Sequence, residues 1–172
     1  NPPDPAPRTA RQRVRAELTA EITDVARSHL AEHGAEGLSL RAVARELGMV
    51  SSALYRYFPS RDHLLTALIV EAYDAVGAAA EEAAGAVGPD DLQGRWLALA
   101  TATRGWAVAH PHEWALIFGS PVPGYRAPSD TIDPAARIPL LLIALAEEAA
   151  TRRSAATPQA TVAPPAVRAD LQ

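Results

Sequence analysis

Apolar residues recur every three to four positions along most of the chain, a period that predicts helices rather than strands. The most informative segment is 40–47, which Gly48 follows as a residue suited to end a helix. One face of that segment carries Leu40, Val43, Ala44 and Leu47. Residues 51–57 predict a second short helix, with Ala53, Leu54, Tyr57 and Phe58 inward and Ser51, Ser52, Tyr55 and Arg56 outward. Two short helices around a tight turn are typical of a helix-turn-helix, whose second helix enters the DNA major groove.

Longer helices are predicted on either side of this motif. Residues 11–33 form the first, which Gly34 ends, and its apolar stripe is Val14, Leu18, Ile22, Val25, Ala26 and Leu30. Ser39 and Ser60 are predicted N-caps, and a long helix follows Ser60 over 61–84. Further helices are expected over 90–110, 111–118 and 135–152, with loops over 34–37 and 119–134. The last helix is apolar nearly all round, which indicates a central position or an interface.

This pattern predicts an all-α protein of 172 residues with four parts. We expect a flexible arm over 1–10, a three-helix DNA-binding head over 11–60, a helical regulatory and dimerisation bundle over 61–152, and a disordered linker with the start of a further helix over 153–172. The longest apolar run, 138–146, is far shorter than the roughly 20 residues that cross a bilayer, so no membrane partner is expected. The chain has no cysteine, which fits a reducing, cytoplasmic setting.

The charge of the chain is unevenly distributed. The net charge is −4, yet residues 1–61 hold nine arginines against seven acids, and the remainder has a balance of −6. A basic head on an acidic body suits a protein that meets phosphate at one end only.

The segment 38–65 resembles the amino-terminal domain of TetR-family repressors. The likeness is carried by Leu-Ser-Leu-Arg-Ala-Val-Ala-Arg-Glu-Leu-Gly-Met and by Leu-Tyr-Arg-Tyr-Phe-Pro-Ser-Arg-Asp-His-Leu-Leu, and it extends over about the first 80 residues. Residues 104–125 are similar to the Trp-His-Gly type of ligand-binding domain found in one branch of that family. Val50 departs from the family pattern, which has Ser or Thr there, so the helix cap is expected to pass to Ser51.

These observations define a set of expected DNA contacts. Ser51, Ser52 and Ala53 open the recognition helix, where hydroxyls meet base edges or phosphate and a methyl meets thymine. Ser39 and Arg41 lie at a helix start, where phosphate binds. The resemblance implies that Tyr55 bonds a phosphate, that Arg56 reaches a base or a phosphate, and that Arg61 clamps a phosphate. The arginines near the amino terminus follow the DNA backbone or belong to a solvated tail; they are Arg8, Arg11, Arg13 and Arg15.

A second set of residues is expected to line a cavity for an apolar or aromatic effector, or to form plain core. This set is Tyr73, Trp96, Leu99, Trp106, Trp114, Phe118 and Tyr125, with Trp106 and Trp114 as the leading members. His110 and His112 flank Pro111 at a helix junction, where their rings diverge, so we expect a structural turn rather than a metal site. No metal and no cofactor are expected.

We therefore expect a homodimeric repressor whose binding to double-stranded operator DNA is relieved by a small molecule. One alternative is a helix-turn-helix regulator without a ligand, its body serving only as core and dimer interface. Another is an α-helical enzyme or small-molecule carrier. An enzyme is disfavoured because the sequence offers no nucleophile–base set, phosphate loop or metal cluster.

Overall fold

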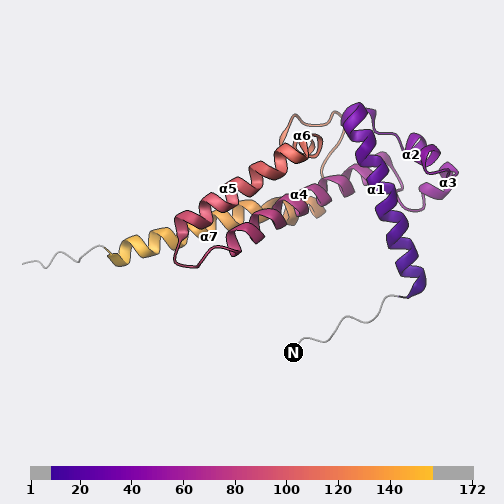
Figure 1. The fold of residues 1–172 in the computed structure, drawn as a ribbon. Helices are drawn as coiled ribbons and strands as arrows, with labels where there is room; N and C mark the ends of the chain where they lie inside the picture. Colours follow the sequence, from indigo (N-terminus) through magenta and orange to yellow (C-terminus); the bar gives the residue numbers. More distant parts are fainter. Residues whose placement is uncertain (1–8, 157–172) are drawn as a thin grey trace, which may run out of the picture.

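The computed structural model describes residues 9–156, and every regular element in that range is a helix, as the sequence predicts. The elements are α1 (Ala10–Gly37), α2 (Leu40–Glu46), α3 (Ser51–Leu54), α4 (Arg61–Gly85), α5 (Leu92–Ala109), α6 (Pro111–Phe118), the 3₁₀ turn η1 (Ser129–Thr131) and α7 (Ile132–Ala156). Helices α1 to α3 form a head at one end, while α4, α5 and α7 run alongside one another as an elongated body (Figure 1). Helix α6 lies where head and body meet.

The head has a hydrophobic core to which α1, α2, α3 and α4 all contribute. Its fully buried side chains include Ile22, Val43, Leu54 and Leu64. The predicted stripe of α1 is confirmed from Ile22 onward but is wrong at its first member, because Val14 is 61% exposed. Val14 only borders Arg56 and Tyr57 at the exit of α3, so it stays outside the core.

The body has a second, smaller core between α4, α5 and α7. Ala80, Ala84, Leu99 and Leu145 are its buried members. Helix α4 belongs to both cores, and it is the one helix of the described residues that is long and apolar enough to cross a bilayer. Its apolar residues face these two cores, which accounts for that composition.

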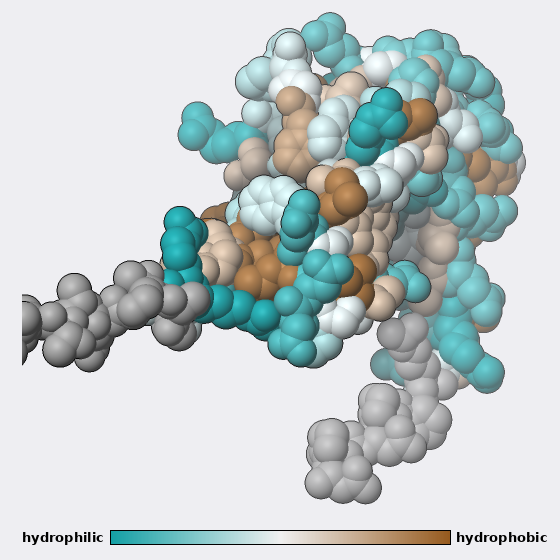
Figure 2. Space-filling model, turned by 60° about the vertical axis from the view of Figure 1, so that its left-hand side comes forward, coloured by the Kyte–Doolittle hydropathy of each residue, from teal (hydrophilic) through white to brown (hydrophobic). Residues whose placement is uncertain are grey.

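Hydrophobic side chains also reach the surface of the body, between charged ones (Figure 2). On α7, Leu145 is buried whereas Leu140 is 61% and Ile143 is 52% exposed. The sequence predicts a central position or an interface for this segment, and α7 has one buried side and also leaves apolar side chains exposed.

Several predicted boundaries move by a few residues. Helix α1 begins at Ala10, because Thr9 and Gln12 form a reciprocal capping box, so residues 9 and 10 do not belong to the expected arm. Gly34 breaks α1 at φ +69° as predicted, but a further helical turn replaces the expected loop over 34–37. Helix α7 begins at Ile132 instead of 135 and continues to Ala156, so 153–156 are not linker. The rest of the predicted arm and linker, 1–8 and 157–172, lies outside the described residues.

A cluster of charges joins the head to the body. The guanidinium of Arg27 on α1 lies 2.6 Å from Asp24, 2.9 Å from Glu71 on α4 and 3.1 Å from Glu113 on α6. Burial raises the pKa of Glu71, against the opposing pull of Arg27. One arginine therefore connects three helices, and the position of the head depends on where α4 and α6 lie.

A second arginine fastens α7 to α4. Arg137 donates to both carboxylate oxygens of Glu81, at 2.9 and 2.6 Å, and to the carboxylate and carbonyl oxygens of Asp74. Its side chain lies over Gly77, where an added Cβ would come within 3.0 Å of it. The small residue on α4 thus allows the arginine to cross the helix, and hydrogen bonds from Arg137 lower the pKa of Glu81.

Replacing Arg137 with methionine should lower the free energy of unfolding by about 1 kcal/mol at neutral pH, since Glu81 and Asp74 are half-exposed and solvent screens the pairs. The pKa of Glu81 is lowered from 4.5, so the stabilisation is complete above that value and is lost as pH falls through the lowered pKa. Urea unfolding at neutral and at acidic pH measures the change in the free energy of unfolding. Arg13→Met, at an exposed arginine, is the control. If the variant lost the same free energy of unfolding at acidic pH as at neutral pH, the ion-pair explanation would be contradicted.

Candidate nucleic-acid interface

The turn between α2 and α3 depends on Gly48. Its φ of +66° lies in the left-handed region that favours glycine, and the Met49 amide then donates to the Ala44 carbonyl at 2.8 Å. Helix α3 begins at Ser51 with Val50 at the N-cap position, so the expected transfer of the cap to Ser51 is wrong. Val50 makes no side-chain cap and is 71% exposed.

The recognition helix is shorter than predicted. Helix α3 ends at Leu54, and residues 55–57 continue as turns, with the Phe58 amide donating to the Leu54 carbonyl at 3.1 Å. Leu54 is 0% exposed and is the only buried side chain of α3, and Phe58 is 7% exposed. Those two side chains hold the segment against the head core, as expected, while Tyr57 is only half-buried.

The opposite side of this segment is open. Ser52, Tyr55 and Arg56 are exposed, whereas Ser51 and Ala53 are half-buried. The body does not cover this side, because α2 and α3 lie at the end of the molecule farthest from it (Figure 1). The surface made by Ser51, Ser52, Tyr55 and Arg56 is called the serine face below.

Helix α2 adds positive charge next to the serine face. Ser39 takes the predicted N-cap position of α2 but forms no side-chain cap bond. Arg41 and Arg45 stand four residues apart on one side of α2, both are exposed, and neither has an ion pair within residues 9–156. Arg45 was not predicted as a contact, although its spacing from Arg41 would have indicated it.

Two expected phosphate contacts have partners inside the protein. Arg61 donates to the Ala35 carbonyl at 2.6 Å, which ties the start of α4 to the last turn of α1. Arg15 donates to the Arg56 carbonyl at 3.3 Å and lies 5.0 Å from the centre of the Tyr57 ring. Both therefore support the helix-turn-helix from within, a role that sequence spacing does not reveal. Arg11 and Arg13 are exposed on α1, and Arg8 lies outside the described residues.

The aromatic set predicted for one cavity divides between two hollows. Tyr73 and Tyr125 line an open hollow of about 690 Å³ between α4, α6 and α7, called the loop hollow. Trp96, Leu99 and Trp114 line an open and almost wholly apolar groove of about 480 Å³ between α5, α6 and α7, called the tryptophan groove. Trp106 and Phe118 line neither, so the predicted set does not gather around one cavity. Trp106 stacks on His110, and the half-exposed Phe118 packs on Trp114 and Tyr73.

Hydrogen bonds hold α6 and the loop that follows it in place. The Tyr73 hydroxyl donates to the Ile117 carbonyl at 2.9 Å, and burial raises the pKa of that tyrosine. The Tyr125 hydroxyl lies 2.9 Å from the Thr66 hydroxyl on α4. Both tyrosines therefore hold α6 and the following loop against α4.

The histidines near α6 do not gather into a cluster. His110 Nδ1 lies 3.0 Å from the Trp106 carbonyl oxygen, His112 is exposed, and Glu113 faces Arg27. Within the described part of the chain, no group of three or more histidine, aspartate or glutamate side chains is placed to hold a metal ion.

Known families match both parts of the molecule. The model described as "Bacterial regulatory proteins, tetR family" matches residues 22–68, and that described as "Tetracyclin repressor-like, C-terminal domain" matches residues 96–170. The HTH-type transcriptional regulator Rv1816 of Mycobacterium tuberculosis is 51% identical over 120 residues, which are 70% of this chain and 51% of that protein. Mb1846 of Mycobacterium bovis matches equally. The chain thus spans about half the length of the curated relatives it matches.

Solved structures agree with the sequence matches. One described as a regulatory protein, SCO4313, is 41% identical with a TM-score of 0.71, covering 84% of this chain and 72% of that one. A TetR-family protein from Shewanella sp. PV-4, 23% identical with a TM-score of 0.64 over 78% and 70% of the two chains, shows likeness of fold alone. The helix-turn-helix geometry, the two family models and these relatives show that the chain belongs to the TetR family of bacterial transcriptional regulators, which are not enzymes.

Proposed function

We propose that this protein represses transcription by binding operator DNA through its serine face, and that a small apolar or aromatic molecule in the body relieves the repression. One observation carries the proposal: Leu54 is fully buried while Ser52 and Arg56, on the other side of the same short segment, are exposed at the end of the molecule. A recognition helix needs such a buried anchor beneath an open polar side.

The exposed residues suggest separate tasks at the DNA. Ser51, Ser52 and Ala53 are small enough to let the backbone approach base edges, and Arg56 carries the charge that phosphate or guanine attracts. Tyr55, 42% exposed, offers its hydroxyl to a phosphate in this proposal. Arg41 and Ser39 at the start of α2 meet the neighbouring backbone, helped by the dipole of that helix. Arg61, already bonded to Ala35, contributes by holding the head together and adds a phosphate contact only as a secondary role.

We infer a homodimer in the cytoplasm. A dimer presents two serine faces to successive major grooves, about 34–36 Å apart or a multiple of that distance. The exposed apolar side chains Leu140 and Ile143 on α7 support an interface there. Sedimentation analysis of the protein with and without duplex DNA tests the stoichiometry.

The connection from effector to DNA would run through α6. One side of this helix contributes Leu116 and Ile117 to the loop hollow, and its Glu113 is paired with Arg27 on the first helix of the head. A molecule that displaces α6 therefore changes the support of the head. Couplings of this kind are typically about 1–3 kcal/mol per site. The Trp-His-Gly type of effector domain stays a prediction.

An effector in the tryptophan groove should change the intrinsic fluorescence of Trp96 and Trp114. A substitution of Thr103 tests the same site more specifically. Its hydroxyl oxygen is buried without a hydrogen-bond partner in the described structure, and the residue lines the groove. Thr103→Val should leave the free energy of unfolding equal or higher by up to about 1 kcal/mol, because an unpaired buried hydroxyl costs free energy. Thr101→Val, at an exposed position of α5, is the matched control.

Fluorescence titration of a panel of apolar aromatic compounds measures binding by both variants. A compound that bonds the hydroxyl should lose roughly 3- to 10-fold in affinity with Thr103→Val and nothing with the control. No fluorescence response to any compound would favour a regulator without a ligand. A response without any shift of duplex DNA in a gel would favour a carrier.

A further inference from the structure

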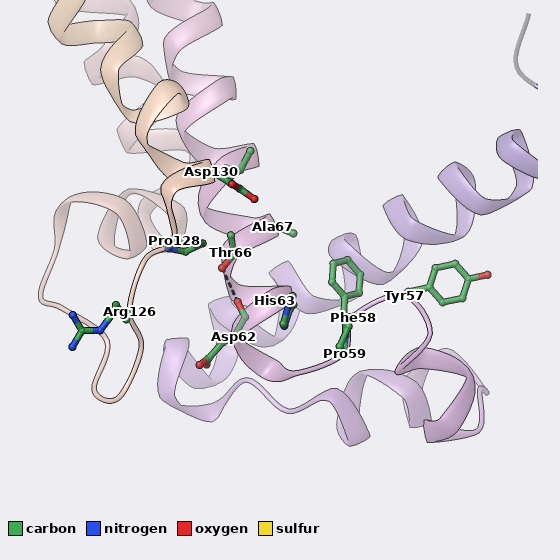
Figure 3. A pocket seen from close by; sticks show the side chains of 11 residues that line it. Tyr57, Phe58, Pro59, Asp62, His63, Thr66, Ala67, Arg126, Pro128 and Asp130 are labelled. Atoms are coloured by element: carbon green, nitrogen blue, oxygen red, sulfur yellow. Dashed lines mark hydrogen bonds between the residues drawn. The ribbon is translucent and has the colours of Figure 1, made fainter.

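A third hollow lies at the junction of head and body, apart from the two hollows of the body. Its volume is about 620 Å³, and three segments line it: the exit from α3, the first three turns of α4 and the loop that leads into α7 (Figure 3). This junction hollow shares no lining residue with the tryptophan groove or the loop hollow. A molecule bound there would touch the head and the body at once.

The floor of the junction hollow is largely apolar. Phe58, Ala67 and Val70 contribute apolar surface, and the imidazole of His63 lies beside the phenyl ring in the close view (Figure 3). The Ser60 hydroxyl is 2.7 Å from His63 Nδ1, which fixes the orientation of that ring. The exposed imidazole of His63, held in this way, provides a ring on which a planar ligand can stack, whereas Phe58, 7% exposed, adds only the edge of a buried ring.

The rim of the junction hollow carries carboxylates from both sides. Asp130 in η1 lies on the body side and Asp62 in the first turn of α4 lies on the head side. Within residues 9–156, Asp130 has only a long contact of 3.4 Å with the Ser129 hydroxyl, and Asp62 is 3.6 Å from Arg61. Arg126 also lines the hollow, but its guanidinium points away from His63 and Thr66 (Figure 3). The Asp62 carboxylate likewise points away from Phe58 in this view, so the negative charge available to a ligand beside Phe58 is that of Asp130 (Figure 3).

Hydrogen bonds hold the loop that lines one side of the junction hollow. The Thr66 hydroxyl lies 2.8 Å from the Asp62 carbonyl oxygen and 2.9 Å from the Tyr125 hydroxyl, which anchors the loop next to Arg126. The Thr131 hydroxyl donates to the Pro128 carbonyl at 2.8 Å, and Thr131 is buried. These bonds fix the backbone on both sides of Asp130.

From this arrangement we propose that the junction hollow is a second small-molecule site, and that it takes a planar organic cation. The ring system of the ligand stacks on His63, and its cationic group pairs with Asp130. This ligand class differs from the uncharged apolar molecule proposed for the body.

Benzamidine is a suitable probe, because it combines a flat ring with an amidinium group. Benzamide has the same shape without the charge, and benzoate has the opposite charge. Two-dimensional amide NMR of the full chain should show benzamidine shifting the signals of His63 and Thr66, with an affinity on the order of 1 mM for so small a molecule. Benzamide should bind at least about 3-fold more weakly and benzoate more weakly still.

Three variants make the test specific. Asp130→Asn should weaken benzamidine binding about 3- to 5-fold and leave benzamide unchanged, while Arg126→Gln should strengthen benzamidine binding because a cation leaves the rim. Asp133→Asn, an exposed aspartate of α7 outside the hollow, should change nothing. All three positions are exposed, so folding is preserved.

The proposal is overturned if benzamidine and benzamide bind equally, if Asp130→Asn has no effect, or if the shifts gather around Trp96 and Trp114. Absence of binding at probe concentrations well above the expected affinity also overturns it. No DNA is used in this experiment, so its failure leaves the proposed repressor function untouched.

Discussion

Replacing Ser51 and Ser52 together with glutamate should abolish sequence-specific DNA binding and leave the fold intact. Ser52 is exposed and Ser51 is half-buried at the start of α3, so two carboxylates fit without disturbing Leu54. They would face phosphates and the acceptor-rich edges of the bases, and like-charge contacts at an interface cost several kcal/mol. The expected loss is more than about 100-fold in affinity, which corresponds to about 3 kcal/mol.

The duplex for this test comes from repeated selection out of a randomised pool by the unmodified protein. Affinity is then measured by gel shift and folding by circular dichroism. The matched control is the pair Ser28→Glu and Ser154→Glu, at exposed positions on α1 and α7, which adds the same charge away from the serine face. Equal losses in both double variants would mean that total charge, and not contact, is responsible.

Leu54→Ala should lower the free energy of unfolding by about 2–5 kcal/mol. The side chain is 0% exposed and packs in the head core with residues such as Ile22 and Leu64, so its removal leaves a cavity that the surrounding helices cannot fill. It is also the only buried side chain of α3, so the serine face would lose its anchor. DNA affinity should therefore fall together with stability.

Urea unfolding followed by circular dichroism measures the effect of Leu54→Ala. Leu97→Ala removes the same atoms from a side chain that is 64% exposed on α5 and should stay within about 0.5 kcal/mol of the unmodified protein. A Leu54→Ala protein as stable as the Leu97→Ala protein would show that α3 does not pack as described.

Local sequence patterns predicted the helix-turn-helix well. The spacing of Leu40, Val43 and Ala44 gave the buried face of α2, and Gly48 at positive φ gave the turn, because both depend on residues close together in the chain. The capping role of Ser60 was predictable for the same reason, and its side chain accepts from the His63 amide. The length of α3 was not predictable, because the packing of Tyr57 and Phe58 against the head decides where the helix ends.

The sequence pattern could not predict contacts between residues that lie far apart along the chain. Arg61 looked like a phosphate clamp, yet the carbonyl of Ala35, remote in sequence, receives its hydrogen bond. The aromatic residues of the body follow one helical period, but the bend at Pro111 sends Trp106 and Trp114 in different directions. Periodicity describes a face of one helix, whereas a pocket requires the angles between several helices.

The central claim is that the serine face touches the DNA, and a tethered cleavage reagent at Ser52 tests it most directly. The chain contains no cysteine, so Ser52→Cys carries a single iron–EDTA label, and Ser154→Cys on α7 carries the label at the far end of the body. With the selected duplex bound, the label at position 52 should cleave the DNA inside the binding site, and the label at position 154 should not cleave it. Cleavage from position 154 with none from position 52 would contradict the account.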